Sequence, residues 1–132
     1  MSIERVNPPS LAPPSGFAHA VIATGGRLVF LAGQTALDAA GQVVGNTVTE
    51  QFEQALTNLL TALAAAGGRP TDLATLTVYA VDLADYRARG HEIGAVWRRL
   101  AGRNYPAMAA VGVSRLWDPA ALVEVQGLAV VG

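Results

Sequence analysis

The chain has 132 residues, of which 52% are hydrophobic and only 14% charged, with a formal net charge of -1 and a mean hydropathy of +0.34. This near-neutral balance argues against bulk attraction to nucleic acid or to an anionic membrane surface. Cysteine is absent, which excludes disulfides, thiolate metal sites and cysteine nucleophiles. All nine basic residues are arginine, so no lysine amine is available for a Schiff-base mechanism.

The length is that of one ordinary domain, and we expect residues 1–132 to fold as a single unit. No apolar run approaches the roughly 18 residues of a membrane span, and no basic start followed by an apolar stretch marks a secretory signal. We therefore predict a cytoplasmic protein that does not enter a membrane. The high apolar content predicts that some apolar surface remains for a partner, and hence a homo-oligomer.

The first quarter of the chain is predicted to run extended and then to form a hairpin. Four of the seven prolines lie in residues 1–17, and such a segment is expected to cross the surface in an extended form rather than as a helix. Residues 19–24 and 27–32 are joined by Gly25-Gly26, and a glycine pair permits the tight turn of a β-hairpin.

The middle of the chain begins with a clear helix signal. Thr47 followed by Glu50 forms a capping box, and apolar residues then recur at helical spacing. This pattern predicts a helix over residues 47–66, which Gly67-Gly68 bring to an end. Residues 74–81 are rich in β-branched side chains and predict a strand.

A second helix, predicted over residues 86–100, is rich in arginine. Five of the nine arginines lie on it or just after it: Arg87, Arg89, Arg98, Arg99 and Arg103. We interpret them as a solvated face with Glu92 as partner. An RNA-binding face is the alternative that we disfavour, because the net charge is near zero and no aromatic residues are interleaved.

Two strands are predicted at the C-terminal end. Residues 106–113 and 121–131 are apolar runs separated by a short polar turn, and we predict that they fold back on each other in the middle of a sheet. The order of elements predicts an α+β fold, a single mixed β-sheet with two helices on one face. The other face must be covered, and a trimer with its sheets facing inward would cover it.

Short motifs in the chain resemble the RidA family, also called YjgF. They are Tyr105-Pro106-Ala107 with Val123-Glu124-Val125, the stretch Gly16-Phe17-Ala18-His19-Ala20, and the triplet Ala32-Gly33-Gln34. The resemblance implies a chorismate-mutase-like fold and a barrel-like homotrimer with three clefts between subunits. It also implies hydrolysis of reactive enamines and imines to a keto acid and ammonia.

The chain departs from the family pattern at positions that hold an anionic substrate. Met108 stands where the family has an arginine, and Ala110 where many members have a cysteine. Phe17 replaces a tyrosine, and Ala32 replaces a serine. A charge-assisted contact of arginine with a carboxylate is worth roughly 1.5 to 3 kcal/mol, so its loss predicts at least about tenfold weaker binding of small keto-acid imines. We therefore predict a largely apolar pocket.

Glu124 is the candidate acid or base, because it matches the family's glutamate, although a solvent-facing strand residue is an equal alternative. His19, which replaces a glutamine, is a second candidate acid or base. Arg115 could restore a cation to the site, but we favour a turn residue paired with Asp118. Residues expected to line the site are Phe17, Ala32, Gly33, Gln34, Met108 and Ala110. Two histidines with one nearby carboxylate make a poor metal site, and we predict neither a metal nor a cofactor.

The sequence thus predicts a RidA-like homotrimer that binds a small, rather apolar metabolite in clefts between subunits. We expect it to hydrolyse or tautomerise an imine or enamine, with Glu124 as the acid or base. A non-catalytic binding or regulatory trimer is the first alternative, and an ordinary 2-iminopropanoate deaminase is the second.

Overall fold

The computed structural model describes residues 2–132, so Met1, part of the segment predicted to be extended, lies outside the described residues. The strands are β1 Ser2–Val6, β2 Ala20–Thr24, β3 Arg27–Gln34, β4 Leu73–Ala80, β5 Ala107–Gly112 and β6 Val123–Val131. The helices are α1 Val48–Ala65, α2 Leu83–Ala88 and α3 Gly90–Ala101, with a short 3-10 turn at Pro70–Asp72.

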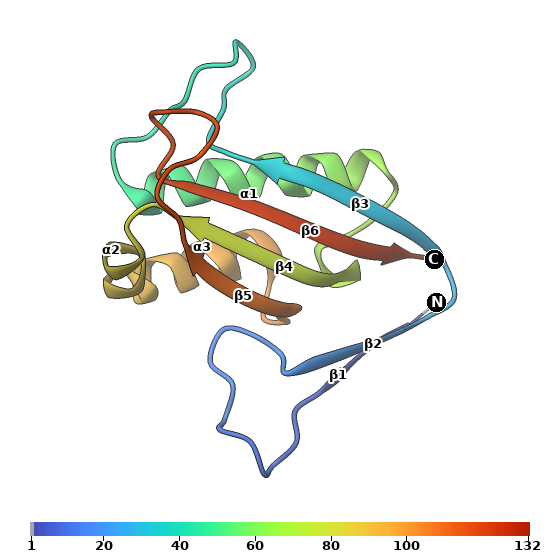
Figure 1. Ribbon diagram of the computed structural model, residues 1–132. Helices are drawn as coiled ribbons and strands as arrows, with labels where there is room; N and C mark the ends of the chain where they lie inside the picture. Colours follow the sequence, from blue (N-terminus) through green and yellow to red (C-terminus); the bar gives the residue numbers. More distant parts are fainter. Residues whose placement is uncertain (1) are drawn as a thin grey trace.

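Four of the strands form a mixed sheet in the order β3-β6-β4-β5, and the helices α1 and α3 pack on one face of it (Figure 1). Strands β4 and β5 run parallel, whereas β6 is antiparallel to both of its neighbours, β3 and β4. Strands β1 and β2 pair with each other as a separate antiparallel ribbon. The predicted α+β fold, with a mixed sheet and helices on one face, is confirmed.

The predicted pairing of the last two strands is wrong, because β4 lies between β5 and β6. The helices α2 and α3 form a crossover after β4, and such a crossover returns the chain parallel to the strand that it left. The connection 113–122 then carries the chain to the far side of β4, where β6 pairs with both β4 and β3. A long connection, rather than a hairpin turn, therefore joins the two strands.

The predicted hairpin around Gly25-Gly26 is also wrong. Strand β2 pairs with β1, which the sequence did not indicate, and β3 pairs with the central strand β6. Both glycines have positive φ, 70° and 83°, and they bend the chain from the ribbon into the sheet. The four prolines of the N-terminal segment lie in the irregular connection between β1 and β2.

The helix α1 begins and ends as predicted. The Glu50 backbone N–H donates to Thr47 Oγ1 at 3.2 Å, and the Thr47 N–H donates to Glu50 Oε1 at 3.1 Å, so the capping box is present. Gly67, with φ of 88°, follows the helix end. The buried side of α1 includes Phe52, Leu56, Leu59 and Leu63, and it forms the core with apolar side chains of β4 and β6.

The second predicted helix is divided into α2 and α3. Arg89 ends α2 and precedes α3, with φ of -98° and ψ of 22°, values outside the helical region. Gly90 follows at the first position of α3, where its low helix propensity favours a break. Arg89 pairs with Asp85 and Glu92, as expected for a solvated face.

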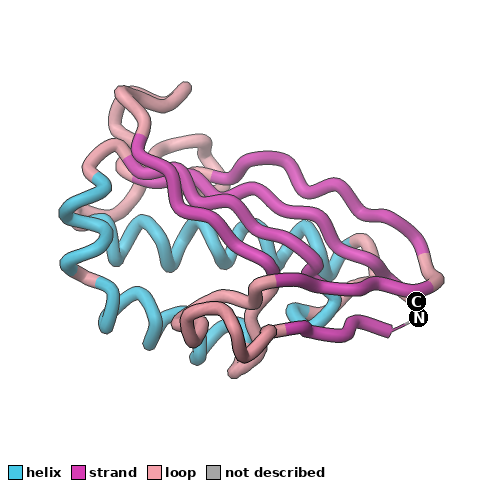
Figure 2. The backbone as a smooth tube through the Cα atoms, turned by 60° about the horizontal axis from the view of Figure 1, so that its bottom comes forward, coloured by secondary structure: helices cyan, strands magenta, loops and turns pink. Residues whose placement is uncertain are grey.

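The sheet face opposite α1 and α3 carries no helix of residues 2–132 (Figure 2). On its edge strand β3, the side chains of Leu28 and Phe30 are 62% and 77% exposed. Exposed apolar side chains this large on one strand are typical of a surface that contacts another chain. None of the helices in residues 2–132 has the length and apolar character needed to span a bilayer.

Candidate functional site

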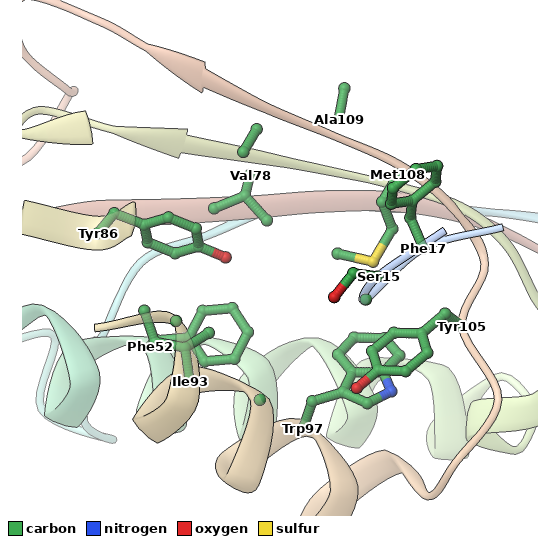
Figure 3. Close-up of a pocket in the computed structure, with 14 residues that line it drawn as sticks. Ser15, Phe17, Phe52, Val78, Tyr86, Ile93, Trp97, Tyr105, Met108 and Ala109 are labelled. Atoms are coloured by element: carbon green, nitrogen blue, oxygen red, sulfur yellow. The ribbon is translucent and has the colours of Figure 1, made fainter. Parts of the chain in front are cut away.

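A cleft of about 260 Å³ opens between the helices and the edge of the sheet at β5 (Figure 3). Its walls come from β4, β5, α1, α2, α3 and the segment that precedes β2. The apolar side chains that line it include Phe17, Phe52, Val78, Ile93, Trp97 and Met108. No charged side chain lines it among residues 2–132, so the lining of this cleft is largely apolar.

The position of the cleft follows from the register of β5 on β4. Met108 pairs with Leu76, and Ala110 pairs with Val78, so both side chains lie on the helix-covered face with the buried residues of β4. The Ala18 N–H donates to the Pro106 carbonyl at 3.0 Å, which fixes the preceding residue, Phe17, beside Met108 (Figure 3). Three of the predicted lining residues therefore meet here.

Aromatic side chains form much of the cleft wall. Trp97 stacks on Tyr105 with ring centroids 5.3 Å apart, and its indole N–H donates to the Asn104 carbonyl at 3.3 Å. Phe52 and Tyr86 meet edge to face at 6.2 Å. Rigid aromatic walls suit a flat or unsaturated ligand, because rings pack best against other planar groups.

The hydroxyl of Tyr86 points into the cleft (Figure 3). It forms no hydrogen bond within residues 2–132, and burial raises the pKa of this phenol to about 12. Tyr86 is therefore a neutral hydrogen-bond donor in an apolar cleft. The sequence marks Tyr86 only as the start of the second predicted helix, although its spacing with Gly90, Ile93 and Trp97 is that of one helix face.

Glu124 lies away from the cleft, on the face of the sheet without helices. Glu124 pairs with Tyr79 and sits between Val123 and Val125, which point to the helices, so its carboxylate points to the opposite face. A Cβ on Gly33 would overlap Glu124 Oε2, so this close approach requires glycine. We call Ala32, Gly33 and Glu124 the Glu124 group; the neighbouring Gln34 ends β3.

His19 lies behind Phe17 and outside the lining of the cleft. Its ring packs edge to face on Phe17 at 5.0 Å, and its Nε2 donates to the Ala12 carbonyl at 2.8 Å. Its backbone N–H donates to Asn7 Oδ1 at 2.8 Å. His19 thus fastens the loop between β1 and β2 and, through this loop, supports the position of Phe17.

Arg115 is exposed in the connection 113–122, and it does not line the cleft of its own chain. The expected pairing with Asp118 is wrong, because Asp118 Oδ2 instead accepts a hydrogen bond from Thr35 Oγ1 at 2.8 Å. Thr35 is buried, so its hydroxyl needs this acceptor more than an exposed guanidinium does. Among residues 2–132, no three His, Asp or Glu side chains gather as a metal site would require.

Comparisons with known proteins agree with this architecture. A family model described as endoribonuclease L-PSP matches residues 8–131. A 2-iminobutanoate/2-iminopropanoate deaminase of Capra hircus is 35% identical over 107 residues, which are 80% of this chain and 74% of that protein. The crystal structure of YyfB from Yersinia pestis, a protein of the conserved Rid family, superposes with a TM-score of 0.89 at 32% identity, covering 99% of this chain and 100% of that one. RidA of Psychrobacter sp. PAMC 21119 superposes with a TM-score of 0.70 at 26% identity, covering 91% and 92%.

Proposed function

Because this chain belongs to the RidA family, whose members deaminate reactive imine and enamine intermediates, we propose that it processes an imine or enamine with an apolar body. The observation that carries the proposal is the uncharged lining of the cleft in residues 2–132. A carboxylate beside Met108 would lose its hydration without gaining a cation, at a cost on the order of several kcal/mol. Small α-imino acids are therefore poor substrates in this proposal.

The proposed assembly is a homotrimer in which two neighbouring copies complete each site. Within one copy, the cleft and the Glu124 group lie on opposite faces of the sheet, so one small molecule cannot touch both. The face that carries Glu124 also exposes Leu28 and Phe30, which supports its burial against another copy. In this assembly, Glu124 of one copy acts on a ligand bound in the cleft of the next copy.

In the proposed reaction, water adds to the imine carbon and the carbon–nitrogen bond then breaks. Glu124 accepts a proton from the attacking water and passes it to the nitrogen, and the proton of the new hydroxyl group follows by the same route as the carbon–nitrogen bond breaks, so the products are a carbonyl compound and ammonia. The Tyr86 hydroxyl donates a hydrogen bond to the imine nitrogen, which fixes the orientation of the substrate. The step consumes only water, and the proposal includes no cofactor.

A non-catalytic binding trimer is the second candidate, and one observation favours it. The polar side-chain atoms in the cleft lining of residues 2–132 are the hydroxyls of Ser15, Tyr86 and Tyr105 and the indole N–H of Trp97. None of these is an acid or base suited to neutral pH, so a single copy can bind a ligand without the means to transform it.

The test compares two imines that amine-oxidising enzymes generate in the assay. One is 2-iminopropanoate, which carries a carboxylate beside the reacting carbon, and the other is 2-phenylethanimine, which carries only an apolar ring. We expect the protein to accelerate ammonia release from 2-phenylethanimine and to leave 2-iminopropanoate nearly at its spontaneous rate. Acceleration of 2-iminopropanoate alone would establish the ordinary deaminase, and acceleration of neither would leave the binding trimer.

A further inference from the structure

A second hollow, of about 460 Å³, opens directly beside the cleft. The two share five residues of their walls, namely Ser15, Gly16, Gly90, Gly94 and Tyr105. Gly90 and Gly94, one helical turn apart on α3, belong to both walls, and neither places a side chain between the two spaces. A ligand longer than a three-carbon imine can therefore occupy both spaces at once.

The outer hollow is lined by basic side chains, in contrast to the cleft. Arg87 comes from α2, and His91 and Arg98 come from α3. We call these three residues the arginine rim. A Cβ on Gly94 would lie 3.3 Å from Arg98 Nη1, so one nitrogen of this exposed guanidinium lies over the shared glycine wall.

The two guanidinium groups of the rim are available for a ligand. Arg89 pairs with Asp85 and Glu92, and Arg99 pairs with Glu53. In the described part of the chain, neither Arg87 nor Arg98 forms an ion pair. Two unpaired guanidinium groups at one hollow attract an anion and can bind it through several hydrogen bonds at once.

We propose that the arginine rim binds a terminal anionic group of the ligand while the apolar body of the ligand fills the cleft against Met108 and Trp97. The ligand class is an aryl or alkyl compound with a carboxylate or phosphate at the end away from the reacting carbon. An α-imino acid carries its charge beside the reacting carbon, so it cannot place this charge at the rim while its body fills the cleft. The inference rests on the proposed function only for the identity of the reacting group, because binding of an anion at the rim requires no catalysis.

Binding of a matched pair of stable probes tests the proposal without any catalysis. 3-Phenylpropanoate and 3-phenylpropanamide have the same apolar body and differ in the charge at the far end. Isothermal titration should show the carboxylate binding about tenfold tighter than the amide at low salt, with the difference shrinking as salt rises. 3-Phenylpropyl phosphate then shows whether phosphate or carboxylate is the preferred anionic group.

Substitutions in the arginine rim test whether its residues cause the difference in affinity between the two probes. The double substitution Arg87→Gln with Arg98→Gln should lower the affinity for 3-phenylpropanoate about tenfold and leave that for 3-phenylpropanamide unchanged. Arg103→Gln is the matched control, because Arg103 is exposed and does not line the outer hollow. Equal affinity for the two probes, binding of neither, or an equal loss in the Arg103 variant would overturn the proposal.

The result separates the rim from the proposed activity. Rim-dependent binding of 3-phenylpropanoate in a protein that accelerates no imine hydrolysis would support the rim and contradict the activity. Acceleration of 2-phenylethanimine hydrolysis without any preference for the charged probe would do the reverse. Tighter, rim-dependent binding of a single-stranded RNA oligonucleotide than of either anionic probe would also contradict a small-molecule rim.

Discussion

The cleft beside β5 and the Glu124 group differ in what each can do alone. The cleft has shape and apolar surface but no charged side chain among residues 2–132, whereas the Glu124 group has a carboxylate on the face of the sheet without helices. In the proposed function, binding and acid–base chemistry are thus divided between two faces of one sheet. This division is the reason for the proposal that two copies complete each site.

The largest effect is expected from removing the carboxylate. Glu124→Gln keeps the size of the side chain but removes the base, so turnover of 2-phenylethanimine should fall by a factor of about 100 or more. Affinity for 3-phenylpropanamide should not change, because the cleft is intact. Glu53→Gln, which removes an exposed carboxylate of α1, is the control and should keep full turnover. A similar loss in both variants would contradict a special role for Glu124.

The next effect is a gain of activity. Met108→Arg should place a guanidinium inside the cleft and raise the turnover of 2-iminopropanoate about tenfold to a hundredfold, because the substrate carboxylate then gains a charged partner. Met108→Leu preserves the apolar lining and should show no gain. Turnover of 2-iminopropanoate by the unchanged protein at the level of the arginine variant would refute the importance of residue 108.

A smaller effect is expected at Tyr86. Tyr86→Phe removes one neutral hydrogen-bond donor and should lower turnover about threefold to tenfold. Folding favours the neutral phenol, since the pKa rises from 10.0 to about 12, so this contribution to stability is present below pH 10 and is lost between pH 10 and about 12. In a spectrophotometric titration, the tyrosine that ionises near pH 12 should disappear in this variant. Its persistence would show that another tyrosine is responsible.

The smallest effect on turnover and on probe affinity is expected from a change in the N-terminal cap of α1. Thr47→Ala should lower the free energy of unfolding by about 1 kcal/mol, because the side chain no longer accepts from the Glu50 N–H. Thermal unfolding measures this loss, while turnover and probe affinity below the transition should stay unchanged. A change in turnover would mean that α1 controls the geometry of the site.

The sequence determined local structure better than strand partners. The capping box at Thr47 and Glu50 set the start of α1, because its hydrogen bonds join residues three apart. The predicted partners of β5 and β6 are wrong, because an apolar run does not specify the strand with which it pairs. The ribbon of β1 and β2 was missed for the same reason.

The candidate site could be predicted only as a set of residues and not as an arrangement. The resemblance named Phe17, Met108 and Ala110, and the structure brings them together. It also named Glu124, but the face on which a side chain lies depends on the strand register, which the sequence alone does not show. Tyr86 was missed because an aromatic residue at helical spacing is usually a packing residue. Its hydroxyl is seen to point into a cleft only in the structure.

A mixed-assembly experiment tests the divided site most directly. Gly90→Phe should fill the cleft, since an added Cβ at Gly90 meets no atom within 4 Å, and Glu124→Gln removes the base. Each variant alone should be inactive toward 2-phenylethanimine, but dissociation and reassembly of an equal mixture should restore about a quarter of the sites by random pairing of neighbours. An equal mixture that contains mixed oligomers by native mass spectrometry and stays as inactive as its parents would contradict the account.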